Sequence, residues 1–260
     1  MDHLLPDEPR SPPLKADPSA VRTLLDVQVV DSTLQQLAHR KKNLPQHAEL
    51  AEVTGRKTAL DNRRVELDTQ IADLTRDQKK ADADVEQVKS RRVRDQQRLD
   101  AGRVSSPREL EQLQSEIVAL DRRIGVLEDA ELEIMEQLES LQGELADVAS
   151  GLEGLNSEVA QIESARDEAV GELDGEAADA TAERQRLADD VPEQLLAVYE
   201  RMRAQLGGVG AAALRRRRCE GCRLELTEAD LATIRSAPDD EVLRCPECNR
   251  ILVRTSDSGL

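Results

Sequence analysis

Four cysteines occur as two Cys-x-x-Cys pairs, and the chain of 260 residues contains no other cysteine. They are Cys219, Cys222, Cys245 and Cys248. Each pair can direct two thiolates from one tight turn towards a single ion, so the two pairs together predict a tetrahedral zinc site. Gly221 and Asn249 tolerate the positive φ that such turns often need. The spacing therefore predicts a zinc ribbon.

Coordination by four protein ligands leaves no open position for water or substrate, so the predicted zinc ion is structural. A pair of disulfides is the alternative, but it requires an oxidising compartment, which the rest of the chain does not suggest. The histidines, His3, His39 and His47, lie far upstream of the cysteines. No glycine-rich phosphate loop, nucleophile elbow or paired-carboxylate pocket is recognisable. We therefore expect no enzymatic activity and no small-molecule substrate.

The composition predicts an elongated helical protein. The chain has one tyrosine, no phenylalanine or tryptophan and 34% charged residues, too few bulky side chains for an ordinary globular core. From about residue 18 to 206, Ala, Glu, Leu, Arg, Asp and Gln dominate, as in long helices that bury a narrow seam. No run resembles a signal peptide or approaches the ~18 apolar residues of a membrane span. We expect a cytoplasmic protein without a membrane partner.

Two runs of heptads form the longest pattern in the chain. Between residues 110 and 162, fifteen of the sixteen a and d positions are apolar, and the exception is Glu131. Between residues 53 and 99, nine of fourteen a and d positions are apolar. Such repeats are typical of a coiled-coil seam.

The short segment at residues 100–107 predicts the tip of a helical hairpin. Gly102 can end one helix, and Ser106-Pro107 can cap and begin the next. The flanking arms, 47–99 and 110–162, are matched in length and predict an antiparallel coiled coil within one chain. A parallel dimer built on the second arm is the alternative, because heptads alone do not fix orientation.

Counting outward from the tip gives a register for the two arms. It places Leu67 beside Leu141 and Gln78 opposite Glu131. The polar exception in the second seam would thus meet a polar partner, a common way for coiled coils to specify register.

The fold class we predict is mainly α, a long antiparallel coiled-coil hairpin followed by a small C-terminal β zinc ribbon. Prolines in residues 1–16 indicate a disordered leader. Asp17 can cap a helix that stops near Pro45, and residues 17–206 form the helical domain. A short helix from Pro192 should pack on the first helix. The ribbon domain then covers residues 207–255, and zinc supplies most of its stability.

Charge is distributed unevenly along the chain. Residues 1–200 carry 25 basic and 44 acidic groups, whereas residues 201–255 carry 11 arginines and 8 acidic groups. Nucleic acid would be repelled by the first part and could be met only by the second. The run Arg215-Arg216-Arg217-Arg218 is the sharpest binding candidate, since adjacent guanidiniums can hold phosphates or an acidic surface. Three further arginines could extend this patch: Arg244, Arg250 and Arg254.

Two other roles for Arg215–Arg218 stay open. A zinc ion held by four thiolates carries a net negative charge, and arginines beside Cys219 would stabilise it without any ligand. Alternate arginines of a strand could also divide the two tasks between them.

The chain resembles the bacterial C4-type zinc-ribbon family, in which a long helical hairpin precedes a C-terminal ribbon. The resemblance rests on residues 24–28, residues 191–203 and the stretch from Cys219 to Val253. Asn249 stands where the family usually has glycine, and asparagine also tolerates the left-handed conformation. The resemblance implies a non-enzymatic adaptor, similar to a flagellar regulator that contacts an RNA and an alternative sigma factor. It covers nearly the whole chain.

The hairpin with a four-cysteine site is also similar to DksA-like factors, which insert a coiled-coil tip into RNA polymerase. Their tips carry an Asp-x-x-Asp-x-Ala motif, whereas this tip has Asp100-Ala101 followed by Arg103, Ser105 and Ser106. We therefore expect a zinc-binding adaptor whose ribbon binds RNA, DNA or a partner protein, with the coiled coil as a spacer. A purely protein-protein adaptor, for example one associated with RNA polymerase, is the alternative.

Overall fold

A computed structural model of the chain describes residues 14–104 and 106–260. The chain divides into two compact units. The hairpin unit is Gln46–Ser164, and the ribbon unit combines the N-terminal residues through Pro45 with Ala165–Leu260. The predictions for the leader up to residue 13, for His3 and for Ser105 lie outside the described residues.

The first helix, α1 (Pro18–Lys42), begins and ends where its sequence predicts. The side chain of Asp17 accepts a hydrogen bond from the backbone N–H of Ser19, and a proline occupies the first turn. Asn43 caps the other end through its backbone N–H. Pro45 cannot donate to a continuing helix, so a second helix starts there.

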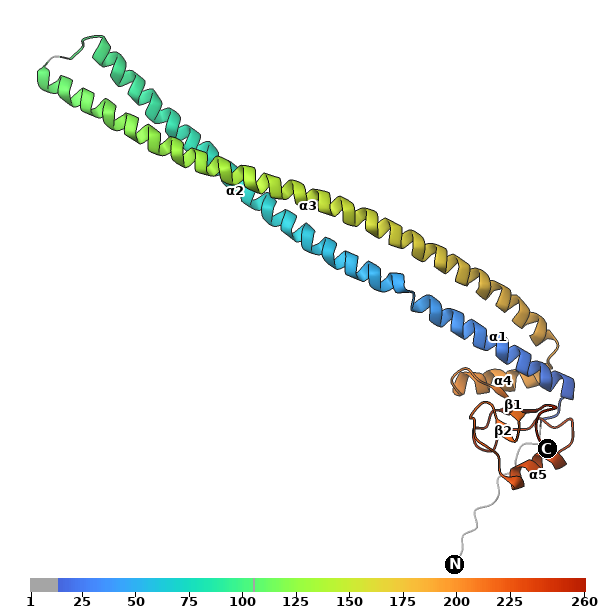
Figure 1. Cartoon of the computed structure of the whole chain (residues 1–260). Helices are drawn as coiled ribbons and strands as arrows, with labels where there is room; N and C mark the ends of the chain where they lie inside the picture. The colour runs from blue at the N-terminus through green and yellow to red at the C-terminus, as the bar shows by residue number, and fades with distance from the viewer. Residues whose placement is uncertain (1–13, 105) are drawn as a thin grey trace, which may run out of the picture. The chain divides into compact units, whose positions relative to one another are not determined.

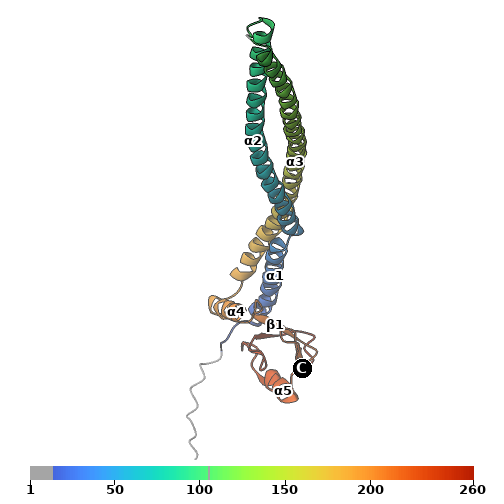
Figure 2. The same ribbon diagram turned by 90° about the vertical axis from the view of Figure 1, so that its left-hand side faces the viewer.

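The hairpin is formed by α2 (Pro45–Asp100) and α3 (Pro107–Asp189), which run side by side in Figure 1 and Figure 2. Gly102 takes a φ of 61° just after α2 ends, as expected for a helix-terminating glycine. The Ser106 hydroxyl accepts a hydrogen bond from the backbone N–H of Glu109 and caps α3. The predicted intrachain hairpin is confirmed, and the parallel dimer is not the arrangement found.

Ion pairs between the two arms fix their antiparallel register. From one pair to the next, moving away from the tip, the residue number falls on α2 and rises on α3, as it must when two helices run antiparallel. These pairs are Arg98–Glu109, Arg91–Glu116, Arg63–Glu144 and Arg56–Glu158. All are exposed, so each contributes at most about 1 kcal/mol and their main role is alignment.

The seam itself is apolar, with Leu67 fully buried and Leu138 nearly so. The residue that acts most strongly on Glu131 is Asp82, one helical turn from the predicted partner Gln78. This contact raises the pKa of Glu131, because two carboxyl groups can share a hydrogen bond only when one is protonated. The polar layer of the seam is therefore an acidic pair.

The remaining elements belong to the ribbon unit. They are α4 (Glu193–Gln205), β1 (Ala211–Arg215), β2 (Arg218–Cys219), α5 (Glu228–Ser236) and β3 (Ile251–Arg254). The strand order is β2-β1-β3, with β1 antiparallel to β2 and parallel to β3. The helix predicted to start after Thr227 is confirmed, since Thr227 and Asp230 form a reciprocal capping box.

Two hydrophobic clusters hold the ribbon unit together. One lies between α1, α4 and the sheet and includes Leu24, Val27, Tyr199 and Ile251, each fully buried. The other lies between the sheet and α5 and includes two of the zinc-site cysteines. The sheet is thus covered by α1 and α4 as well as by α5, and the expected packing of α4 on α1 is confirmed.

The predicted boundary at residue 207 does not separate two independent units. The ribbon lies in one compact unit with α1 and α4 and shares the first cluster with them. The leader predicted over residues 1–16 also extends too far: Leu14 accepts a hydrogen bond from Val242, and Ala16 donates one to Asp240.

None of the helices among the described residues is both long enough and apolar enough to cross a membrane.

Candidate metal centre and arginine turn

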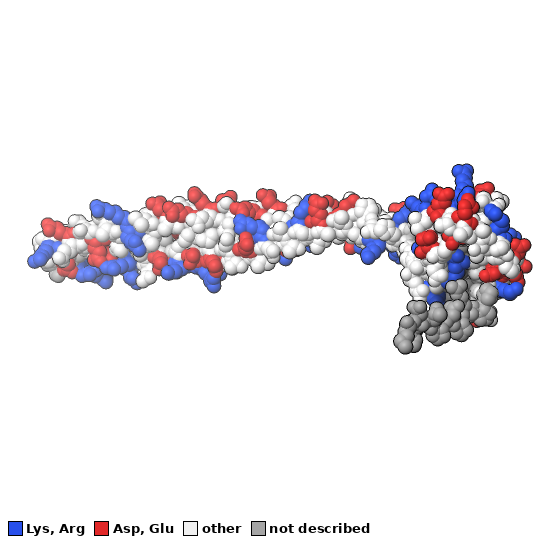
Figure 3. Space-filling view, turned by 90° about the horizontal axis from the view of Figure 1, so that it is seen from below, with Lys and Arg blue, Asp and Glu red and all other residues white. Residues whose placement is uncertain are grey.

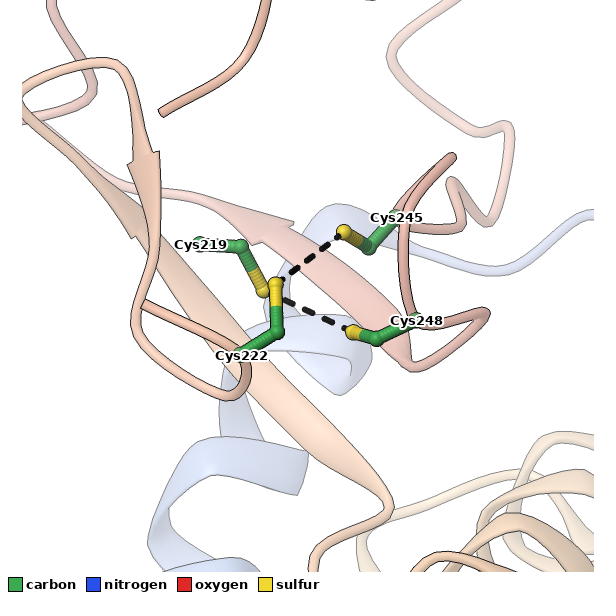
Figure 4. Close-up of side chains that lie close together, drawn as sticks. All are labelled: Cys219, Cys222, Cys245 and Cys248. Carbon is green, nitrogen blue, oxygen red and sulfur yellow. Dashed lines mark hydrogen bonds between the residues drawn. The ribbon is translucent and has the colours of Figure 1, made fainter. Parts of the chain in front are cut away.

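The four cysteines meet at one point of the ribbon, as Figure 4 shows. Their ligand atoms all lie within 4.8 Å of one another, and two sulfur pairs, Cys219–Cys248 and Cys222–Cys245, are 3.9 Å apart. Four sulfurs bound to one zinc ion at ~2.3 Å would be about 3.8 Å apart at the corners of a tetrahedron. None of the cysteines is in a disulfide. The geometry fits one structural zinc ion.

Each cysteine pair sits in a turn of the same construction. The backbone N–H of Arg223 donates to the carbonyl of Cys219 at 2.7 Å, and that of Asn249 donates to Cys245 at 2.9 Å. Arg223 and Asn249 both take a φ of 60°. The left-handed residue in each turn is therefore the one after the second cysteine, which bears out the role of Asn249.

Gly221 has a different role from the one predicted. Its φ is not positive, but a Cβ there would lie 2.6 Å from Cδ of Arg250 and 2.9 Å from Cβ of Ala212. Glycine is needed because the turn packs closely against the sheet.

The thiols differ in their surroundings. Burial raises the pKa of Cys219 and of Cys245. Burial also acts to raise the pKa of Cys248, but hydrogen bonds from the backbone and side chain of Arg250 outweigh it and lower that pKa to about 7. Arg250 is thus the arginine that favours the thiolate form of Cys248.

The four consecutive arginines form a tight hairpin turn, which we call the arginine turn (Arg215–Arg218). Arg215 and Arg218 pair across β1 and β2, and the two residues between them have φ values of 43° and 68°. Positive φ at both central positions defines a type I′ turn, in which asparagine and glycine are the usual residues. Arginine there costs of order 1 kcal/mol or more per residue.

The C-terminal segment holds this strained turn in place. The backbone N–H groups of Arg216 and Arg217 donate to the carbonyls of Asp257 and Ser258 at 2.7 and 2.9 Å. Ser258 is buried, and its hydroxyl donates to Leu214. The turn is therefore fixed by the fold around it.

The side chains of the arginine turn differ in their partners. Arg217 is paired with Glu228 on α5, and Arg218 donates to the backbone carbonyl of Arg223. Arg215 and Arg216 are exposed, and neither side chain has a hydrogen bond or ion pair within the described part of the chain. The two free guanidiniums lie at one end of the β1–β2 hairpin.

The other predicted binding arginines are largely engaged inside the protein. Arg250 donates to the carbonyls of Val209 and Leu206, at 3.0 and 2.9 Å. Arg254 donates to three backbone carbonyls at the end of α5 and pairs with Asp239. Arg244 is exposed and contacts Met202 and Asn249. The patch expected from the sequence is thus reduced mainly to the arginine turn.

A buried polar network, absent from the sequence-based predictions, ties the ribbon to the helices. The side chain of Asp31 on α1 is fully buried and accepts hydrogen bonds from Arg184 on α3 and from Tyr199 on α4, both at 2.7 Å. Arg203 lies 3.3 Å from the same carboxylate. Burial and the contact with Asp31 raise the pKa of Tyr199, so its hydroxyl stays protonated and donates.

Gln28, one turn before Asp31, continues this network to the sheet. Its side-chain oxygen accepts hydrogen bonds from the backbone N–H of Gly210 and from Tyr199, and its amide donates to Gly208. A Cβ on Gly210 would lie 2.7 Å from the carbonyl oxygen of Tyr199, so the chain passes α4 at a distance only glycine permits. In the sequence, this network is marked by two polar residues, Gln28 and Asp31, on the otherwise apolar face of α1.

Comparisons with known proteins agree with this architecture. Residues 27–207 match the model of the CT398-like coiled coil hairpin domain, and residues 218–252 match that of the C4-type zinc ribbon domain. Neither match indicates an enzymatic family. Together with the clustered cysteines, they establish a zinc ribbon with one structural zinc ion.

Similar proteins are found in bacteria. An uncharacterised protein of Mycobacterium tuberculosis is 35% identical over 241 residues, covering 93% of this chain and 98% of that protein. A second, from Mycobacterium leprae, is 28% identical over 222 residues, with 85% and 95% covered.

Two solved structures share the fold. One from Mycobacterium smegmatis is 34% identical with a TM-score of 0.82, covering 93% of this chain and all of the other. CT398 from Chlamydia trachomatis is 21% identical with a TM-score of 0.69, covering 91% and 98%, and supports the fold alone.

Proposed function

This chain belongs to the CT398-like coiled coil hairpin family, and we propose that it is a non-enzymatic adaptor whose zinc ribbon binds the phosphate backbone of a nucleic acid. The arginine turn makes the contact. The hairpin unit serves as a spacer. Zinc acts structurally by fixing the ribbon on which the turn is built.

The observation that carries this proposal is the unpaired state of Arg215 and Arg216. Charge balance at the zinc site is the alternative role for these arginines, but the arginine that lowers the pKa of a cysteine thiol, that of Cys248, is Arg250. Arg216 stands at a strained positive φ, and the guanidiniums of Arg215 and Arg216 are both exposed and unpaired within the described part of the chain. They fit phosphate groups, which accept charge-assisted hydrogen bonds from arginine.

A second observation supports backbone contact without base readout. The chain has no tryptophan or phenylalanine, and its one tyrosine is fully buried, so the ribbon has no aromatic side chain for base stacking. We therefore expect binding that depends strongly on salt and weakly on base sequence.

The test compares the full chain with a variant carrying Arg215→Gln and Arg216→Asn, because asparagine accepts the positive φ at residue 216. A matched control carries Arg201→Gln and Arg235→Gln, which remove two exposed arginines elsewhere in the ribbon unit. Binding to single-stranded RNA and to duplex DNA is measured by fluorescence anisotropy over a range of salt concentrations.

We expect the turn variant to bind about tenfold more weakly or worse on every sequence. The slope of log K against log salt should flatten by about 1.4 for RNA or about 1.8 for DNA, as two phosphate contacts are lost. The control should behave like the parent. Equal binding by parent and turn variant, with zinc content unchanged, would refute the proposal.

A protein partner is the second candidate, supported by Leu224. This side chain is 50% exposed and its residue follows Arg223, so an apolar contact lies near the arginines. The net charge of −17 also opposes long-range attraction of nucleic acid. If both nucleic acids fail to bind and an acidic, leucine-containing peptide binds in a manner sensitive to Leu224→Ser, the adaptor acts between proteins.

A further inference from the structure

The outward face of α3 in the hairpin unit carries apolar side chains where a solvated helix normally has polar ones. Val118, Val126 and Leu132 are 50, 59 and 55% exposed. They occupy b and c positions of the heptads, opposite the seam that packs on α2. On the face drawn in Figure 3, uncharged stretches likewise separate red and blue side chains along the hairpin.

These residues share one stripe with two opposite charges, and we call it the outer stripe of α3. It consists of Val118, Arg122, Gly125, Val126, Asp129 and Leu132. Arg122 and Asp129 are both exposed, and neither forms a hydrogen bond or ion pair within the described part of the chain. Gly125 has open space around it, since a Cβ there would meet nothing within 4 Å.

We propose that the outer stripe of α3 is a self-association surface that pairs with the same stripe of a second copy, antiparallel to it. The middle of the stripe, from Arg122 to Asp129, is self-complementary about the point between Gly125 and Val126. Residues equally distant from that point face each other across a twofold axis, so every contact occurs twice.

The central contacts made in this arrangement are complementary in both size and charge. Val126 of one copy lies over Gly125 of the other, and Leu132 lies over Ala119, so in these two contacts a large side chain meets a small one. Val118, at the edge of the contact, lies over Glu133. Arg122 of each copy faces Asp129 of the other. A parallel arrangement would instead place identical residues together, including like charges.

The stripe is short, which bounds the strength of the dimer. Its ends, Val118 and Leu132, are fourteen positions apart in the sequence, a length of about 21 Å along the helix. Such a contact buries less than the roughly 800 Å² per partner of a standard stable interface. We expect a weak dimer that is populated at roughly 100 μM chain and dissociated at roughly 1 μM.

The first test is sedimentation velocity of the zinc-loaded full chain over this concentration range at low ionic strength. Val126→Glu should shift the monomer–dimer midpoint at least tenfold towards higher concentration. Val65→Glu on α2 is the matched control, because Val65 is also valine and also 59% exposed. An equal effect of both substitutions, or a parent that stays monomeric at 100 μM, would overturn the proposal that the outer stripe of α3 binds a second copy.

The second test uses the charges to fix orientation. Arg122→Asp places like charges together in the dimer, and so does Asp129→Arg, so each variant alone should stay monomeric. Mixing the two restores both ion pairs, and heterodimers should form at the parent's concentration. Circular dichroism checks that helicity is unchanged. Failure of the mixture to associate, while both single variants are folded monomers, would overturn the antiparallel arrangement.

Discussion

Replacing Tyr199 by phenylalanine should weaken the ribbon unit while leaving the hairpin unit intact. The hydroxyl of Tyr199 donates to the fully buried carboxylate of Asp31 at 2.7 Å. The change removes this donor and leaves the ring in place, so it creates no cavity in the core. Asp31 keeps its contact with Arg184 but loses one of the hydrogen bonds that compensate its burial.

The size of the effect follows from the charged acceptor. A buried hydrogen bond to a charged group contributes about 1.5–3 kcal/mol, and we expect a loss of about 2 kcal/mol in the free energy of unfolding of the ribbon unit. With a urea m-value of about 2 kcal/mol/M, the midpoint should fall by about 1 M.

The assay follows the two units separately. Zinc release to a chromogenic chelator during urea denaturation reports the ribbon unit, and far-ultraviolet circular dichroism reports mainly the long helices. Thr33→Val is the control on α1, because the exposed Thr33 hydroxyl bonds to a carbonyl of its own helix.

We expect Tyr199→Phe to lower the urea midpoint of zinc release, and Thr33→Val to leave it within about 0.3 M. If Tyr199→Phe left zinc release unchanged, or shifted the helical transition equally, the Asp31 network would not tie the ribbon to α1 and α4 in the way we infer.

Three further changes test other parts of the structure. Metal analysis should give one zinc ion per chain, and Cys222→Ser or a chelator should unfold the ribbon but keep most helicity, whereas zinc-free folded protein would contradict this. Glu131→Gln should raise the thermal midpoint of the hairpin at pH 7 but not near pH 4. The pKa of Glu131 is raised beside Asp82, so protonated Glu131 stabilises the fold below the ordinary pKa of 4.5. This contribution is lost as the pH rises through the raised pKa, and the uncharged glutamine avoids that loss. Gly210→Ala should cost about 1–3 kcal/mol because its Cβ would lie 2.7 Å from a backbone oxygen, whereas Gly143→Ala, in open space on α3, should stabilise by about 0.5–1 kcal/mol; equal effects would refute the close-approach argument.

Local signals in the sequence were sufficient for most of the architecture. Heptads of Leu, Ile and Val predicted both arms, and Asp17 and Gly102 marked helix ends through conformations they adopt without help from the rest of the fold. The spacing of the cysteines predicted the metal centre because each turn is built within a few residues. Such features depend on near neighbours, which the sequence displays directly.

The roles of individual arginines depend on tertiary neighbours. Arg250 and Arg254 looked like members of a binding patch, but their partners are mainly backbone carbonyls, which every segment of the chain possesses. Asp31 is one of many acidic residues on helices, and only the folded arrangement brings Arg184 and Tyr199 to it. The burial of the Asp31 carboxylate could not be predicted from the position of Asp31 in the helical pattern.

The central claim is that Arg215 and Arg216 are free to bind phosphate while Arg250 and Arg254 hold the fold together. The most direct measurement is nuclear magnetic resonance of the arginine Nε–Hε groups in the zinc-loaded chain, titrated with a short single-stranded RNA and with duplex DNA. We predict that the signals of Arg215 and Arg216 shift with at least one of these ligands and that those of Arg250 and Arg254 do not. Saturating nucleic acid that moves none of the arginine-turn signals, or that moves arginines of the hairpin unit instead, would contradict the account.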